Sequence, residues 1–287
     1  MSASAEVRIG GGTHVVGIIG WPVTHSLSPA IHNAAFAAAG LDWAYLPLPV
    51  PPERLTPALA GLVPLGFAGA NVTMPHKTEV VELIPRRSED ATLLRAVNTI
   101  TVRGGDLEGH NTDVGGFDRF LRRDAGFDPA GRTALIYGAG GAARACALAL
   151  ARAGLAGLTV AARDETRAAP LVRMMEAFPV SVALVRPDGA GGLAPDLVVN
   201  ATPVGRPDGE EIHPSLPHLG PGVLVIDLLY DPPSTDLQLR AREAGATAFG
   251  GLGHLLEQAA LSFELWTGTP APLDVMSAAA LAALTER

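Results

Sequence analysis

Short apolar runs alternate with Ala-rich helical stretches along the first third of the chain. The alternation predicts strands at residues 13–20, 43–48 and 67–72, and helices at residues 28–39 and 52–62. Ser28 is a good helix N-cap, and Pro29 suits the first helical position. Strands that alternate with helices in this way predict a mainly parallel sheet.

The pattern changes between residues 91 and 113. Residues 96–103 read as a strand, Gly104 and Gly105 as a tight turn, and residues 107–110 as a return strand. Gly115 and Gly116 then lead into a helix that runs through Arg123. We place the first domain boundary at Asp113, where the hairpin ends.

A continuous apolar run at residues 132–137 opens the second region and is typical of a strand covered on both faces. Helices are expected to about residues 153 and 178, loops at residues 189–192 and 205–217, and strands at residues 157–162, 180–184, 196–200 and 223–228. These elements predict an open, doubly wound sheet. From Gly251 the pattern is helical to the end, with an interruption at residues 268–272.

Composition narrows the class of protein. The chain has 287 residues, 48% of them hydrophobic, and a net charge of −8 without a basic stripe, which argues against nucleic acid and anionic membranes as partners. The single cysteine, Cys146, excludes an internal disulfide. Neither a signal peptide in the first 12 residues nor an apolar run of about 18 residues is found, so we expect a cytoplasmic protein. The histidines are scattered, and no metal site is expected.

The segment Asn71-Val-Thr-Met-Pro-His-Lys77 follows the apolar strand at residues 67–72. Pro75 sits where a helix tolerates proline, so we expect the strand to run directly into a helix. Chemistry in α/β proteins concentrates at such strand ends. An ammonium group placed there can hold an anion or move a proton, although an isolated lysine in a first helical turn is more often simply solvated.

Several other polar residues have a functional explanation only if they lie close to Lys77 in the folded chain. Ser26 and Ser28 stand beside a predicted helix start, where hydroxyl groups can bind a carboxylate, or Ser28 can simply cap the helix. Asn98 and Asp113 lie at opposite ends of the hairpin, where both residue types also occur as ordinary turn residues. Gln258 lies one turn beyond His254 and could point into a cleft or into solvent.

The run Gly138-x-Gly140-x-x-Ala143 lies between an apolar strand and a long helix, as dinucleotide-binding loops do. Gly138 permits the tight turn, Gly140 lets the backbone approach a pyrophosphate, and the helix N-terminus favours the anion. The next strand ends in Arg163 and Asp164. An acidic residue there accepts hydrogen bonds from the ribose hydroxyls of NAD, whereas an arginine can hold the 2′-phosphate of NADP.

Taken together, these segments resemble the shikimate dehydrogenase family over almost the whole chain. The resemblance rests on His25-Ser-Leu-Ser-Pro29, Asn71-Val-Thr-Met-Pro-His-Lys77, Ala96-Val-Asn-Thr99, Gly109-His-Asn-Thr-Asp113, Gly138-Ala-Gly-Gly-Ala-Ala143, Asn200-Ala-Thr-Pro-Val-Gly205, Asp227-Leu-Leu-Tyr230 and Gly251-Leu-Gly-His-Leu-Leu-Glu-Gln258, in that order.

The resemblance implies a two-domain α/β enzyme that reduces 3-dehydroshikimate to shikimate reversibly with NADP, in the chorismate pathway to aromatic amino acids. It implies a substrate domain of residues 1–113, completed by residues 251–287, and a Rossmann domain of residues 114–250. The resemblance assigns catalysis to Lys77 and Asp113, alone or together, and substrate binding to Ser26, Ser28, Thr73, Asn98, Tyr230 and Gln258. Coenzyme binding falls to Gly138, Ala139, Gly140, Gly141, Ala142, Arg163, Thr202, Leu228 and Gly251, with Asp164 as a rival at the ribose.

Three alternatives stay open at this level. Ala162-Arg163-Asp164 departs from the Asn-Arg-Thr that NADP-linked members usually show, so NAD is an alternative coenzyme. A quinate or quinate/shikimate dehydrogenase would use the same two catalytic residues. A coenzyme-binding regulatory protein without turnover is the rival of another class, and the presence of Lys77 and Asp113 counts against it. No pattern encodes the oligomeric state, for which a homodimer is one candidate.

Overall fold

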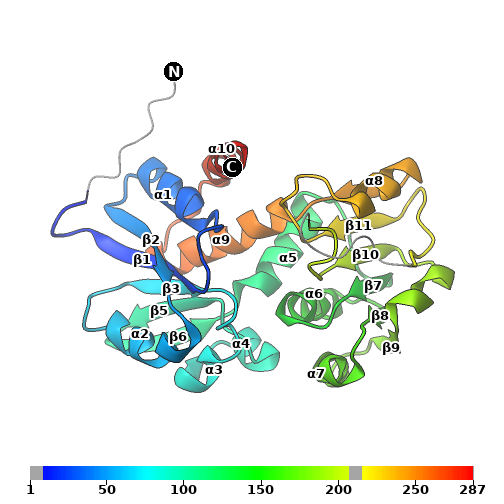
Figure 1. Cartoon of the computed structure of the whole chain (residues 1–287), viewed down its shortest axis with the longest axis horizontal. Coiled ribbons are helices and arrows are strands. Elements are labelled where there is room, and N and C mark those ends of the chain that lie inside the picture. The colour runs from blue at the N-terminus through cyan, green and yellow to red at the C-terminus, as the bar shows by residue number, and fades with distance from the viewer. Residues whose placement is uncertain (1–8, 207–214, 287) are drawn as a thin grey trace. The chain divides into compact units, whose positions relative to one another are not determined.

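The structure is a computed structural model that describes residues 9–206 and 215–286. Part of the predicted loop at residues 205–217, and most of the N-terminal stretch from which a signal peptide was excluded, lie outside the described residues. Contacts divide the chain into two compact units (Figure 1). The first unit comprises Met1–Thr112 and Leu256–Arg287, and the second comprises Asp113–Leu255.

The first unit is built on a six-stranded mixed sheet in the order β2-β1-β3-β5-β6-β4. Strand β1 pairs in parallel with β2 and β3, and β5 runs antiparallel to β3 and β6. The bounds are β1 His14–Gly20, β2 Trp43–Pro49, β3 Gly69–Val72, β4 Arg86–Arg87, β5 Thr99–Arg103 and β6 Asp106–His110. The predicted fold class, α/β with a mainly parallel first sheet, is confirmed, with the hairpin supplying the antiparallel part.

The two faces of this sheet differ in chemistry because successive side chains of a strand point to opposite faces. Ala70, Val72 and Ile100 join an apolar core with α2 (Leu55–Leu62), α3 (Val80–Leu83) and α4 (Glu89–Leu94). Asn71 and Thr99 point the other way, toward α9 (Leu252–Thr267). A polar layer therefore runs under α9, on the opposite face from the apolar core. The 3-10 turn Pro52–Arg54, α1 (Ser28–Ala38) and α10 (Leu273–Thr285) complete this unit.

The second unit is a six-stranded, fully parallel sheet in the order β12-β11-β10-β7-β8-β9. Read from β7, this is the strand order 3-2-1-4-5-6 of dinucleotide-binding sheets, whose order reverses between β7 and β10. The bounds are β7 Thr133–Tyr137, β8 Gly157–Ala161, β9 Ser181–Val185, β10 Leu197–Asn200, β11 Leu224–Asp227, β12 Thr247–Phe249, α5 Thr112–Arg123, α6 Gly141–Arg152, α7 Glu165–Met175 and α8 Asp236–Glu243, with a 3-10 helix at Pro187–Gly192.

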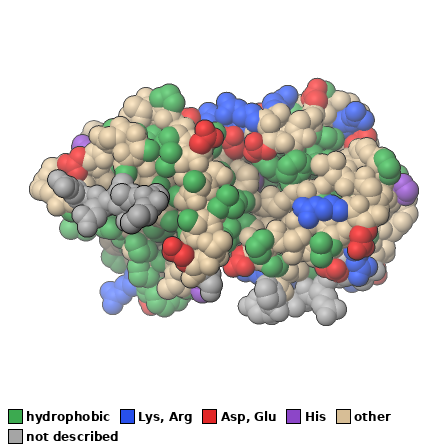
Figure 2. Space-filling view, turned by 90° about the horizontal axis from the view of Figure 1, so that it is seen from above, with side chains coloured by type: hydrophobic (Ala, Val, Ile, Leu, Met, Phe, Trp, Pro, Cys, Tyr) green, Lys and Arg blue, Asp and Glu red, His purple; other side chains and the backbone are tan. Residues whose placement is uncertain are grey.

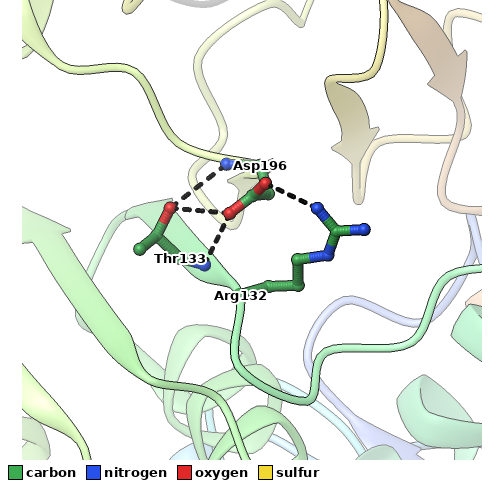
Figure 3. A network of polar contacts seen from close by, with 3 residues as sticks. All are labelled: Arg132, Thr133 and Asp196. Atoms are coloured by element: carbon green, nitrogen blue, oxygen red, sulfur yellow. Dashed lines mark hydrogen bonds and ion pairs between the residues drawn. The ribbon is translucent and has the colours of Figure 1, made fainter.

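A polar cluster closes the end of this sheet where its parallel strands begin (Figure 3). Asp196 accepts hydrogen bonds from the Thr133 backbone (2.8 Å) and hydroxyl (2.9 Å) and from Arg132 (3.1 Å). These partners, first of all the Thr133 N–H, lower the pKa of the Asp196 carboxyl. The cluster ties the segment before β10 to the start of β7.

Several local predictions are wrong. Residues 74–79 form turns and α3 begins only at Val80, so Pro75 does not start a helix. Ser28 is the first residue of α1 and makes no cap, since the N-cap position is Leu27. Helix α5 already begins at Thr112, ahead of the two glycines, and the predicted loop at residues 189–192 lies within the 3-10 helix. Strands β4 and β12 and helix α8 were not predicted.

Candidate active site

The carboxyl ends of β1 and β3 hold the predicted catalytic segment in place. The Thr73 N–H donates to Ile19 (2.9 Å) and the Trp21 N–H to Met74 (3.1 Å). A Cβ atom on Gly20 would lie 2.3 Å from Thr73 Cγ2, so a glycine at position 20 allows the segments after β1 and β3 to approach this closely. Thr73, predicted to bind the ring hydroxyls, is thus fixed at the edge of the sheet.

Backbone contacts fix Lys77 as well. Its carbonyl oxygen accepts a hydrogen bond of 2.8 Å from the Val97 N–H, and the fully buried His76 ring bonds the Val50 carbonyl (2.7 Å). The Lys77 side chain is half-buried. It is also the only lysine among 287 residues, since the remaining 20 of the 21 basic residues are arginines. Arginine stays protonated in proteins whereas lysine can exchange its proton, so Lys77 is the one basic side chain of this sequence that suits a proton carrier.

The structure brings together two predicted substrate residues that are 160 positions apart. The Asn98 side chain donates to the Gln258 side chain (3.5 Å) and to the Thr112 hydroxyl (2.9 Å). Ser26 and Ser28 are also neighbours, because the Ser28 N–H donates to the Ser26 hydroxyl oxygen (3.2 Å). Ser28 is buried, which leaves Ser26 as the more accessible hydroxyl.

Asp113 lies in the first turn of α5 and is 7% exposed. Its backbone carbonyl accepts a hydrogen bond of 3.1 Å from the His254 ring, which meets the Phe117 ring edge-on at 5.7 Å. The carboxylate is therefore presented by a helix start that His254 anchors. Tyr230 belongs to the same unit and is half-buried just after β11.

The predicted coenzyme loop follows β7, at the reversal of strand order. Gly138 has φ +105°, and a Cβ there would lie 3.0 Å from the Ala201 carbonyl oxygen. Gly140 is the N-cap of α6, and open space surrounds the Cβ positions of Gly140 and Gly141. Ala139 and Ala142 are both partly exposed beside them. This glycine-lined approach to a helix N-terminus fits a pyrophosphate.

Arg163 and Asp164, which follow β8 and Ala162, differ in their surroundings. Asp164 is the N-cap of α7: its carboxylate accepts a hydrogen bond of 3.1 Å from the Arg167 N–H and lies 3.6 Å from Arg167 Nε. Arg163 is exposed and takes no part in this cap. The arrangement favours Arg163 for contact with the coenzyme.

A second buried network supports the loops after β10 and β11. The Asp227 carboxylate accepts hydrogen bonds from Asn200 (3.0 Å), the Leu229 N–H (3.1 Å) and Thr235 (2.7 Å). Burial raises the pKa of Asp227, and these hydrogen bonds partly offset the shift. Thr202 donates to Asn200 (2.6 Å), so the network reaches a predicted coenzyme residue. A Cβ on Gly251 would lie 2.0 Å from the Leu228 carbonyl oxygen, which explains the glycine there.

Sequence reasoning missed the buried polar residues that support both groups of site residues. Asn71, Thr99 and Ser262 lie beneath Asn98, and Asp227 and Thr235 lie beneath the coenzyme loops. The available signal was a polar side chain within an apolar run, as at Asn71 and Asp227. A cavity of about 540 Å³ beside Thr101, Arg103 and Trp266 lies toward the other end of β5 and contains none of the predicted site residues.

Surface charge and helix lengths add little to the site. On the face drawn in Figure 2, basic side chains of the described residues are interspersed with acidic ones. None of the described helices has the length and apolar character to cross a bilayer. Within residues 9–206 and 215–286, no three or more His, Cys, Asp or Glu side chains come together as a metal site would need.

A parallel sheet with a glycine-rich turn at its reversal point, in a chain whose other α/β unit carries Lys77 in the turns after β3, is typical of two-domain dinucleotide-dependent dehydrogenases. Comparison with known proteins narrows this class. Residues 18–100 match the shikimate dehydrogenase substrate binding domain, and residues 251–281 match the shikimate 5'-dehydrogenase C-terminal domain.

The chain is 45% identical to the shikimate dehydrogenase (NADP(+)) of Methanopyrus kandleri, covering 97% of this chain and 98% of that one. Among solved structures, it resembles a Thermus thermophilus shikimate 5-dehydrogenase in complex with NADP(H) and shikimate, at 34% identity and a TM-score of 0.84, covering 94% and 100% of the two chains. It also resembles a Corynebacterium glutamicum quinate dehydrogenase in complex with NAD, at 32% identity and a TM-score of 0.84, covering 95% and 99%. This chain belongs to the shikimate dehydrogenase family.

Proposed function

We propose that this protein is an NADP-dependent shikimate dehydrogenase, which interconverts 3-dehydroshikimate and shikimate in the pathway to chorismate and the aromatic amino acids. The observation that carries the proposal is the 45% identity, over nearly the full length of both chains, to a shikimate dehydrogenase (NADP(+)). The residue types that the reaction needs support it: Thr73 follows β3 directly, and Ser28 and Asp113 lie in the first turns of helices.

The first unit is the proposed substrate domain. Ser26 and Ser28 bind the carboxylate, while Thr73, Asn98 and Gln258 bind the ring hydroxyls. These groups are neutral donors and acceptors, which suit a polyhydroxylated acid. Lys77 supplies positive charge and an exchangeable proton.

The second unit is the proposed coenzyme domain. Gly138 to Ala142 accommodate the pyrophosphate at the start of α6, and Thr202, Leu228 and Gly251 line the rest of the site. Arg163 binds the 2′-phosphate, using a planar guanidinium that can form two parallel hydrogen bonds to phosphate. Asp164 does not compete for it because its carboxylate caps α7.

NADP, when bound, supplies hydride chemistry at the carbon that carries the reacting oxygen. The protein must move the proton of that oxygen, and Lys77 and Asp113 are the proposed carriers. The Lys77 backbone carbonyl is held by the Val97 N–H, and Asp113 lies in the first turn of α5. Either residue can carry the proton alone, or the two can share it.

Quinate is the second candidate substrate, because a quinate dehydrogenase is among the similar structures. Shikimate and quinate differ by hydration of one ring double bond and would use the same groups. The deciding experiment compares kcat/KM for shikimate and quinate, each with NADP and NAD, by absorbance of the reduced nicotinamide. The proposal predicts the highest value for shikimate with NADP. A preference for quinate with NAD overturns it, and no turnover with any pair favours a regulatory protein.

We place the enzyme in the cytoplasm, where its proposed coenzyme is available, and cell fractionation with immunodetection tests this. The homodimer stays a prediction that light scattering on the purified chain can decide.

A further inference from the structure

A network of buried hydrogen bonds lies beneath Asn98 and Gln258 in the first unit. Strands β2, β3 and β5 and helices α5 and α9 contribute one side chain each, and none is more than 7% exposed. The five are Tyr45, Asn71, Thr99, Thr112 and Ser262. Buried polar groups must be paired with one another in a consistent pattern of donors and acceptors, so their connections can be worked out.

The orientation of the Asn71 amide follows from its backbone partner. One of the two terminal atoms of the Asn71 side chain lies 3.1 Å from the Asn98 backbone carbonyl oxygen. That oxygen can only accept a hydrogen bond, so the terminal atom is the amide nitrogen. The Asn71 oxygen on the other side accepts a hydrogen bond of 2.7 Å from the Tyr45 hydroxyl. Burial raises the pKa of Tyr45, which keeps the hydroxyl protonated as a donor.

The orientation of the Asn98 amide follows in the same way. The Thr112 backbone N–H, which can only donate, lies 2.8 Å from one side-chain atom of Asn98, and that atom must therefore be the oxygen. The Asn98 nitrogen then faces the Thr112 hydroxyl (2.9 Å) and the Gln258 side-chain oxygen (3.5 Å). A flipped amide would leave a buried N–H without an acceptor, which is costly.

Ser262 is the common acceptor of this network. Its hydroxyl donates to the backbone carbonyl of Gln258 one turn earlier (3.1 Å), so its oxygen is left to accept. It accepts from Asn71 (3.1 Å) and from the Thr112 hydroxyl (3.2 Å). Its shortest contact is with the Thr99 hydroxyl (2.8 Å), so Thr99 donates to Ser262, and the Asn98 oxygen keeps the Thr112 N–H as its donor.

We propose that Ser262 is a positioning residue for the reaction: by anchoring Asn71 and Thr112, it holds the Asn98 amide so that its N–H side faces Gln258 and the substrate. This inference rests on the proposed function, which makes Asn98 a substrate-binding residue.

The test is a double-mutant cycle between Ser262→Ala and Asn98→Ala, measured as kcat/KM for shikimate with saturating NADP. Ser262→Ala alone should lower kcat/KM about tenfold, the equivalent of one lost hydrogen bond, mainly through a higher KM. In the Asn98→Ala background it should cause no further loss. Thr267→Ala is the matched control, since Thr267 makes the same bond to the preceding turn of α9 (2.8 Å) outside the network. The control should keep wild-type kinetics.

A readout without turnover separates this inference from the proposed function. The side-chain amide resonances of Asn98 are identified in nitrogen–proton spectra by their loss in Asn98→Ala. Ser262→Ala should shift them and speed their exchange with water, and Thr267→Ala should not. Unchanged resonances, or additive losses in the cycle, overturn the positioning role. A wild-type protein without turnover contradicts the proposed function, while the resonances still decide the role of Ser262.

Discussion

The Asn200 side chain donates a hydrogen bond of 3.0 Å to Asp227, and this buried contact joins the carboxyl ends of β10 and β11. The two residues support the loops that carry Thr202 and Leu228, which are proposed to line the coenzyme. The affinity for NADP should therefore depend on a carboxylate that need not touch the coenzyme.

Replacing Asp227 with alanine should lower the free energy of unfolding by about 3 kcal/mol, because three buried donors lose their acceptor. The dissociation constant for NADP, measured by calorimetry, should rise as well. Asp236→Ala is the control: its exposed ion pair with Arg240 (3.2 Å) should contribute less than about 1 kcal/mol. Equal losses in urea unfolding of the two variants would contradict the supporting role of Asp227.

His32 should make the fold sensitive to acid. Burial lowers the pKa of His32 from 6.5 to about 3, and the ring is 0% exposed. Between these two pH values the unfolded chain binds a proton that the folded protein does not, so stability falls as the pH is lowered through this window. His32→Leu should remove roughly 2–3 kcal/mol of the loss between pH 7 and 4.5, as seen in urea unfolding at each pH.

Phe36→Leu is the control for this experiment, because Phe36 packs at 6.2 Å from the His32 ring and does not titrate. It should lower stability by a similar amount at every pH. If His32→Leu retains the wild-type pH dependence, the acid sensitivity arises elsewhere.

Gly138 and Gly140 of the predicted coenzyme loop are expected to respond differently to replacement by alanine. Gly138→Ala should destabilise the fold by about 1–3 kcal/mol, since the new side chain meets φ +105° and the Ala201 carbonyl. Gly140→Ala should leave stability unchanged, because its φ of −74° is ordinary and its surroundings are open. The second variant should still weaken NADP binding by roughly tenfold or more, as the Cβ blocks the backbone approach to the pyrophosphate. Wild-type affinity in Gly140→Ala would place the pyrophosphate elsewhere.

Coenzyme preference should depend on Arg163 and not on Asp164. Arg163→Ala should lower kcat/KM with NADP by roughly 10–100-fold, the effect of losing hydrogen bonds to a charged group, and change the value with NAD little. Asp164→Ala should cost about 1 kcal/mol of stability through the lost α7 cap and leave the preference unchanged. A wild-type preference for NAD that depends on Asp164 would reverse the assignment.

The sequence predicted the elements whose causes are local. The apolar runs of β7, β8 and β10 were found within a residue or two, because a strand covered on both faces reads as continuous hydrophobicity. Strands β4 and β12 have only two and three residues, and pairing with a neighbour creates them. Helix α5 extends through two glycines because Phe117 and Phe120 are buried beside them.

The same contrast between local and long-range causes separates the site residues that were predicted from those that were missed. Single residues such as Lys77 and Ser26 stood out through motifs at strand and helix ends, and their roles stay predictions. The contact between Asn98 and Gln258 spans 160 positions, and no local pattern could supply it. The supporting residues Ser262 and Asp227 were missed because their importance comes from what they hydrogen-bond, which only the folded chain shows.

Turnover by Lys77→Ala tests the account most directly. The hydrogen bond from the Val97 N–H goes to the backbone carbonyl of Lys77, which alanine keeps. This variant should therefore fold normally and bind shikimate and NADP nearly as the wild type does. Its kcat for shikimate oxidation should fall by a factor on the order of 10²–10⁴, the usual effect of losing a proton carrier. Lys77→Arg, which keeps the charge without an exchangeable amine, should fall almost as far. A near-wild-type kcat with only a raised KM would contradict the account and make Lys77 a binding residue.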